Sequence, residues 1–339
     1  MTNIDLRTHL TVVITLIATM AAPGAAAAQT ISGGPVEVVS AAPSSATLTP
    51  ATLPPYSLPW QLRPVTTGNV LRIDSAAAVF NDVQGNVDIA VTSVVAASYQ
   101  LTPHWAPMVR LGFVGNNAPG AALDGSSFVN PLVGATYTKR TESIRLGLFG
   151  ATTIPVGSGG GNAPNGGAAK TDAAAPMARP ADDVMFAVDY VTEIVGADVA
   201  YVNHGLTAQA EATLMQSIRV RGNDSAGGTD RFRTNSSVGF HLGYFMGSHF
   251  SLGGDLRYQR WLSHPTTLDE LTGAPVPLAA SKINTVTVAV GPRLHFRLGK
   301  HAWIRPGVSY VRGLDARGFD APLITAQTTA VMIDVPVIF

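Results

Sequence analysis

The sequence predicts an all-β protein: a 12-stranded antiparallel up-and-down transmembrane β-barrel, preceded by a signal peptide and an irregular N-terminal extension. Three observations lead to this fold class. The 339 residues are 46% hydrophobic but only 13% charged, with 34 Gly and 23 Pro, which favours strands and turns over helices. Long segments alternate apolar with polar or small residues at a period of two. The connections between these segments alternate between short and long.

Residues 1–28 have the pattern of a secretory signal peptide. Residues 10–22 form a short apolar core, and the alanines at 26–28 provide a cleavage site before Gln29. A buried N-terminal helix is the alternative. Residues 29–68 are rich in Pro, Ala, Ser and Thr and carry almost no charge. We interpret them as a periplasmic extension, which is either a linker or a plug that folds back into the barrel.

Residues 282–298 show the strand pattern of the predicted barrel domain, residues 69–339, most clearly. Even-numbered positions from 286 to 298 are apolar, whereas odd-numbered positions from 285 to 297 are polar or small. A helix would mix these two sets on each side, so a strand with two different faces is favoured. Twelve such segments can be identified, at about 69–80, 86–102, 104–115, 126–139, 142–155, 190–203, 205–220, 233–247, 249–262, 282–298, 301–313 and 327–339.

The connections predict which ends of the strands lie together. Short turns follow the second, fourth, sixth, eighth and tenth segments, and long loops lie near 116–125, 156–189, 221–232, 263–281 and 314–326. The last segment ends on MIDVPVIF, in which Val335, Val337 and Phe339 share an apolar face and Asp334 points the other way. We expect this strand to pair with the first strand, because an open sheet edge has no hydrogen-bond partners in lipid.

These features resemble bacterial outer-membrane β-barrel proteins, in which a final aromatic residue is read by the barrel-insertion machinery. The resemblance implies that Val335, Val337 and Phe339 form this signal. It also implies an integral outer-membrane protein with both termini in the periplasm. Residues 130–137 (NPLVGATY), 146–148 (LGL) and 154–157 (IPVG) further resemble the strand–turn–strand unit of transporter-like barrels linked to meta-pathway phenol degradation. That resemblance implies uptake of small molecules, hydrophobic ones among them.

If the apolar faces contact lipid, the opposite faces line the lumen. A charge facing lipid at mid-bilayer costs about 2–4 kcal/mol, so we place these strand residues inside: Arg72, Asp74, Asp88, Arg110, Arg145, Asp198, Glu211, Arg219, Asp255, Arg257, Arg293, Arg297, Arg305 and Asp334. They either steer polar or weakly anionic solutes or pair with one another and fill the interior. Arg293, His295 and Arg297, with Arg257 and Arg305 on adjacent strands, are the candidate anion-selective group.

The loop at 156–189 has two interpretations: a mobile external loop, or a constriction folded into the barrel mouth. Its Gly-Ser-Gly-Gly-Gly stretch lacks the Gly-Lys-Ser/Thr ending of a phosphate-binding loop, so we assign it no nucleotide.

The composition excludes several function classes. Basic and acidic residues balance at 22 each, which argues against nucleic acid as a partner, and the absence of cysteine excludes thiolate metal sites and cysteine nucleophiles. We predict no cofactor, no metal site and no catalytic residues. The predicted function is passage of small solutes across the outer membrane. The alternative is a non-conducting structural or surface-interaction barrel, and the third reading is an outer-membrane hydrolase built on His249 and Ser251.

Overall fold

The computed structural model describes residues 56–65, 68–81, 87–117, 125–161, 178–179, 182–222, 231–263, 266–268, 275–277, 284–298, 302–314 and 329–339. The predicted signal peptide and most of the predicted extension 29–68 lie outside these ranges. Within the ranges, no helix is both long and apolar enough to cross a membrane.

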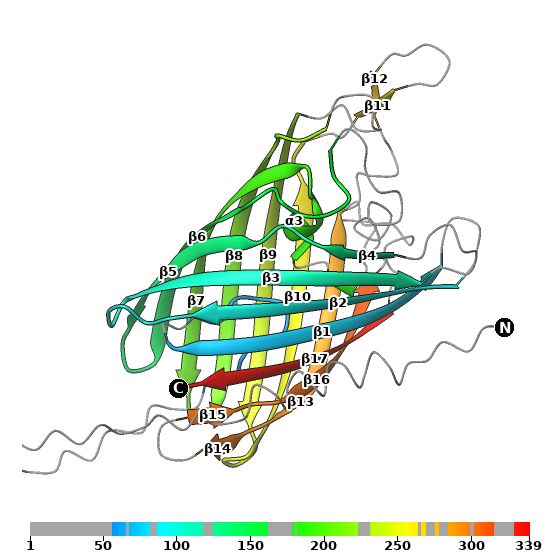
Figure 1. Ribbon diagram of the computed structural model, residues 1–339. Helices are drawn as coiled ribbons and strands as arrows, with labels where there is room; N and C mark the ends of the chain where they lie inside the picture. The colour runs from blue at the N-terminus through cyan, green and yellow to red at the C-terminus, as the bar shows by residue number, and fades with distance from the viewer. Residues whose placement is uncertain are drawn as a thin grey trace, which may run out of the picture. The chain divides into compact units, whose positions relative to one another are not determined.

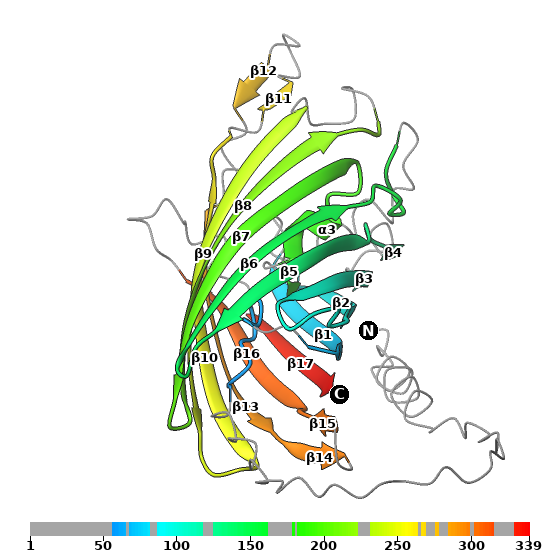
Figure 2. The same cartoon turned by 90° about the vertical axis from the view of Figure 1, so that its left-hand side faces the viewer.

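Twelve strand positions form one closed antiparallel barrel, which confirms the predicted fold class (Figures 1 and 2). Neighbours along the chain are also neighbours in the sheet, as in an up-and-down barrel. Nine positions hold an uninterrupted strand: β1 (Val70–Asn81), β2 (Val87–Ser98), β3 (Trp105–Asn117), β6 (Ile144–Thr153), β7 (Tyr190–Asn203), β8 (Leu206–Arg219), β9 (Phe232–Phe245), β10 (Phe250–Trp261) and β17 (Thr329–Ile338).

Three positions hold a strand in two pieces: β4 (Gly125–Phe128) with β5 (Leu132–Arg140), β13 (Thr285–Leu294) with β14 (Phe296–Leu298), and β15 (Ala302–Ile304) with β16 (Gly307–Leu314). Between β4 and β5 the register against β3 shifts by one residue, which is a β-bulge. Between β15 and β16 lies Pro306, which has no N–H to donate to the ladder. A separate hairpin of β11 (Thr266–Leu268) and β12 (Pro275–Pro277) forms a second small sheet.

The barrel closes through its first and last strands, as predicted. β1 and β17 pair antiparallel from Val70 opposite Ile338 to Val79 opposite Thr329. Beyond this ladder, the backbone N–H of Phe339 donates to the carbonyl oxygen of Asn69 at 3.0 Å. No strand edge is therefore left open at this seam.

The strands present two chemically different faces. Along β7, β8 and β9 exposed and enclosed side chains alternate, and the outward positions include Leu214, Phe240 and Leu242, which are 45–61% exposed. The inward positions are mainly polar or small. This arrangement places an apolar belt around the outside, where lipid would contact it, and a polar lining within.

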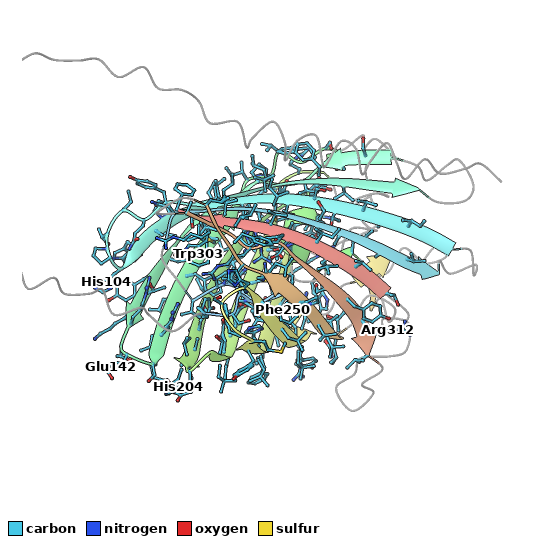
Figure 3. The ribbon with its side chains drawn as sticks, turned by 90° about the horizontal axis from the view of Figure 1, so that it is seen from below. His104, Glu142, His204, Phe250, Trp303 and Arg312 are labelled. Atoms are coloured by element: carbon cyan, nitrogen blue, oxygen red, sulfur yellow. The ribbon has the colours of Figure 1, made fainter. Side chains whose placement is uncertain are left out.

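Short turns gather at one end of the barrel, which we call the short-turn end. Figure 3 labels His104, Glu142 and His204 at this end, and Arg312 at the opposite end. The turn between β7 and β8 consists of His204 and Gly205, with φ of 47° and 82°. Two residues of positive φ match the twist of paired strands, which explains why this hairpin is so tight.

Candidate functional site in the barrel lumen

Residues 56–65, which we call the finger, lie inside the barrel (the blue coil in Figure 1). The finger enters at the short-turn end beside Thr207 and reaches the level of Asp255, near the middle of β10. It then returns to Asn69 and the start of β1. Its apolar side chains are enclosed, with Trp60 and Leu62 only 3% and 4% exposed.

Two carboxylates of the barrel wall hold the finger by its backbone. Asp255 Oδ2 accepts hydrogen bonds from the N–H groups of Trp60 and Gln61 at 2.8 and 2.6 Å, and His241 Nδ1 lies 2.6 Å from its other oxygen. Glu211 accepts from the backbone N–H of Arg63 at 2.7 Å and from its guanidinium group at 3.2 Å. Hydrogen bonds to charged acceptors are worth about 1.5–3 kcal/mol each, so these contacts fix the position of the finger tip.

Side chains of the finger contact the wall as well. Tyr56 donates from its hydroxyl to Gln209 Oε1 at 2.6 Å, and Thr287 donates from its hydroxyl to Gln61 Oε1 at 2.6 Å. The guanidinium of Arg293 lies 4.1 Å from the centre of the Trp60 ring, a cation–π contact. Burial raises the pKa of the Tyr56 phenol, so it remains a neutral hydrogen-bond donor.

Glycines of the wall make room for the finger. A Cβ atom added at Gly307 would lie 2.5 Å from the Trp60 ring, and one added at Gly239 would lie 2.9 Å from Leu62. A Cβ atom at Gly243 would collide with Ser57. The wall and the finger therefore fit closely at three separate points.

The last part of the predicted 156–189 loop also lies within the barrel, near its long-loop end. We call residues 178–179 and 182–189 the inner loop; it contains the short helix α3 (Asp183–Phe186), seen inside the mouth in Figure 2. Met185 packs fully buried among inward residues of β3, β5, β7 and β8. Asn130, in the bulge between β4 and β5, donates to the carbonyls of Ala187 and Tyr190 at 3.0 and 3.1 Å.

A chain of seven alternating charges crosses the lumen. It runs in the order Arg110, Asp182, Arg179, Asp74, Arg72, Asp334 and Arg293, with nitrogen–oxygen distances between 2.5 and 3.3 Å. The chain links β3, the inner loop, β1, β17 and β13, and it ends beside Trp60 of the finger. Burying charges is costly unless each is paired, so removing one member would leave its neighbours without compensation.

Asp182 is the member that anchors the inner loop. Burial by itself would raise the pKa of its carboxyl, but the adjacent guanidinium groups of Arg179 and Arg110 outweigh burial and hold this pKa below its ordinary value. The carboxylate is therefore ionised across the whole neutral range.

The structure places most of the predicted lining residues in the interior. Glu211, Asp255, Arg257, Arg293 and His295 are buried, and Arg219 and Arg305 are partly buried. The candidate anion-selective group, however, is divided. The strand is interrupted at His295, and Arg297 lies beyond the interruption on β14, exposed and opposite Trp303 of β15. Arg297 is therefore not part of the buried cluster around Arg293. The side chain of Asp88 lies outside the described part of the chain.

Sequence reasoning missed four groups that the structure brings into the lumen: Trp60, Arg63, Arg179 and Asp182. All four lie outside the predicted strands, where a period of two gives no information about orientation. The available signal was composition: Trp60 and Arg63 are a bulky aromatic residue and a charge in an extension otherwise rich in Pro, Ala, Ser and Thr.

The serine and histidine of the hydrolase reading lie in different settings. His249 contacts Ser248 at 2.7 Å, whereas Ser251 contacts His295, with its hydroxyl 2.8 Å from Nε2. The Nδ1 atom of His295 has no partner within the described ranges, so no carboxylate orients this ring. A serine nucleophile needs a base held by a third group, and this pair lacks one.

The sequence matches no protein-family model and no curated protein. Among solved structures, the COG4313 outer membrane channel from Pseudomonas putida F1 is 11% identical, with a TM-score of 0.53 over 86% of this chain and 99% of that chain. The NanC porin aligns with 10% identity and a TM-score of 0.45 over 79% of this chain and 98% of that chain. The KdgM porin, in complex with disordered oligogalacturonate, aligns with 9% identity and a TM-score of 0.42 over 79% of this chain and 99% of that chain. At 11% identity, the similarity to the COG4313 channel is evidence of the fold alone. The chain therefore has the fold of a bacterial outer-membrane channel.

Proposed function

We propose that this protein is an outer-membrane channel for small solutes, whose lumen is closed by the finger and opens when the finger leaves. The observation that carries the proposal is the insertion of residues 56–65 into a polar, arginine-rich lumen. The exposed apolar belt supports a location in the outer membrane.

The cavities beside the docked finger support a closed state. The cavity next to Trp60 and Arg179 has a volume of about 20 Å³, counted as the space that the centre of a water molecule can occupy. On the same measure, the cavity beside Arg63 and Arg257 has a volume of about 10 Å³. A cavity needs about 10–15 Å³ on this measure to hold one water. Neither of these two cavities admits a solute while the finger is docked, and we propose that passage requires its withdrawal.

The polar groups that the finger covers suggest the solute class. Withdrawal uncovers Arg293 and Arg305, which now contact Trp60 and the carbonyl of Tyr56, together with the carboxylates Asp255 and Glu211. A lumen with both charge types and several guanidinium groups suits small polar or weakly anionic solutes. We propose no catalytic role for these residues.

The second candidate function is a non-conducting barrel that uses its external loops. The close fit of the finger favours it, because a permanently docked finger would obstruct the described lumen. In both functions we propose that residues 1–28 are a signal peptide and that residues 29–68 act as an extension of the barrel domain 69–339. We also propose that both termini lie in the periplasm, and that Val335, Val337 and Phe339 are the signal for the barrel-insertion machinery.

A disulfide between finger and wall tests the gate directly, because the chain contains no cysteine. In the double variant Leu62→Cys/Gly239→Cys the new side chains would face each other, since a Cβ atom at Gly239 lies 2.9 Å from Leu62 Cγ. Single-channel current is recorded in a planar bilayer under oxidising and then reducing conditions, with both single-cysteine variants as controls. We expect no openings in the oxidised protein and intermittent ohmic openings after reduction. Equal current in both states would show that the finger is not the gate, and silence of a folded protein in both states would favour the non-conducting barrel.

A further inference from the structure

The cavity between the finger tip and the inner loop has hydrogen-bond donors that lack acceptors. Two buried side chains that line it each carry such an N–H: Gln61 Nε2 and Arg179 Nη1 have no acceptor within the described ranges. Arg72, which also lines the cavity, is paired with Asp334, whose carboxylate lies 2.8 Å from its Nη2 atom. Buried polar groups in native proteins nearly always have a partner, so two beside one cavity call for an explanation.

The carboxylates in the lining of this cavity are already paired with arginine. Its two carboxylates, Asp74 and Asp182, are already engaged by Arg72, Arg179 and Arg110. No oxygen of a lining residue is among the buried side-chain atoms without a partner in the described chain. The charge chain also has arginine at both ends, so four guanidinium groups face three carboxylates and leave one positive charge in excess.

A water molecule does not suit this environment. Water can accept these hydrogen bonds, but as a neutral molecule it leaves the excess positive charge uncompensated. A small anion accepts from several N–H groups at once and balances the excess charge. The available space, about 20 Å³ for the centre of a water-sized sphere, fits a halide and excludes a phosphate or an aromatic acid.

We propose that this cavity binds one monovalent anion of chloride size, which accepts hydrogen bonds from the finger and the inner loop together. Gln61 contributes from the finger, and Arg179 contributes from the inner loop. The anion is a structural bridge between the two inserted segments. The site depends on the docked finger but not on conduction, so it stands whether or not the barrel carries current.

Chloride binding is measured by the line width of ³⁵Cl in solution NMR, with the protein purified from outer membranes into detergent and the buffer anion otherwise gluconate. We expect saturable broadening for the unmodified chain. Gln61→Glu retains the oxygen that accepts from Thr287 but replaces the free donor with a negative charge, and we expect chloride affinity to fall more than about tenfold. The matched control is Gln259→Glu, another buried glutamine, which does not line the cavity and which we expect to leave affinity unchanged.

A second variant protects the test against misfolding. Arg179→Lys keeps the positive charge beside Asp74 and Asp182 and removes the free Nη1 donor, and we expect chloride affinity to fall by about three- to tenfold. Absence of saturable broadening in the folded unmodified chain would overturn the proposal. Equal broadening in the unmodified chain and in folded Gln61→Glu would overturn it as well.

Discussion

Replacing Asp255 with alanine will loosen the finger, because this carboxylate receives two of its backbone N–H groups. The bonds from Trp60 and Gln61 measure 2.8 and 2.6 Å, and both donors are buried when the finger is docked. A hydrogen bond to a charged partner is worth about 1.5–3 kcal/mol, so the two together contribute at least about 3 kcal/mol to docking. The variant also loses the contact between Asp255 and His241, but this contact is lost in the docked and undocked states alike. It therefore cancels from the free energy of docking. The undocked fraction should rise roughly hundredfold.

The chemical modification of one introduced thiol measures this fraction. Leu62→Cys places a cysteine at a position that is 4% exposed in the docked finger, in a chain with no other cysteine. When docking and undocking are fast compared with modification, the labelling rate by a small maleimide follows the undocked population. We expect the rate in Leu62→Cys/Asp255→Ala to be roughly hundredfold that in Leu62→Cys alone.

The matched control is Ser251→Ala in the same Leu62→Cys background. Ser251 is buried on the same strand, but its hydroxyl contacts His295 of the wall rather than the finger. We expect an unchanged labelling rate. Heat-modifiable migration on a gel shows whether the Asp255→Ala protein is folded. If the folded double variant is labelled at the same rate as Leu62→Cys alone, the carboxylate does not hold the finger and the reasoning is wrong.

Three further predictions test other parts of the structure. Gly307→Ala will displace the finger, because its Cβ would lie 2.5 Å from the Trp60 ring, whereas Gly150→Ala has no close contact with the finger; Leu62→Cys labelling compares the two. The pKa of Asp182 is lowered, so its contribution to docking of the inner loop is complete above the ordinary pKa of about 4 and is lost as pH falls below it. The rate of protease cleavage within the inner loop, measured as a function of pH, should rise as the pH falls below about 4. Asp182→Asn should remove this pH dependence. Leu256→Arg will cost about 2–4 kcal/mol in urea unfolding, because it faces lipid in the middle of β10, whereas Leu262→Arg, just past the strand end, will cost about 0–1 kcal/mol.

The strands of this barrel were predictable because each one carries its own information. A strand residue contacts either lipid or lumen according to the parity of its position, so the period of two in residues 282–298 specifies both the element and its orientation. The apolar face of the final strand likewise predicted its pairing with β1. The inward placement of Arg293 and Asp255 followed from the same local rule, since lipid penalises the opposite orientation.

The contents of the lumen were decided by the tertiary structure. Asp255 meets Trp60 across 195 residues of sequence, and Arg179 meets Asp74 across 105. Neither the finger nor the inner loop has a periodic pattern, because a segment enclosed by a barrel contacts wall residues in every direction. Which charges pair inside depends on how the closed sheet sets its register, as when Asp74 comes to lie opposite Asp334. The sequence by itself therefore determined the wall, whose residues respond to lipid and lumen one strand at a time. Only the closed barrel decided what fills it, because those contacts exist only once all twelve strands are in place.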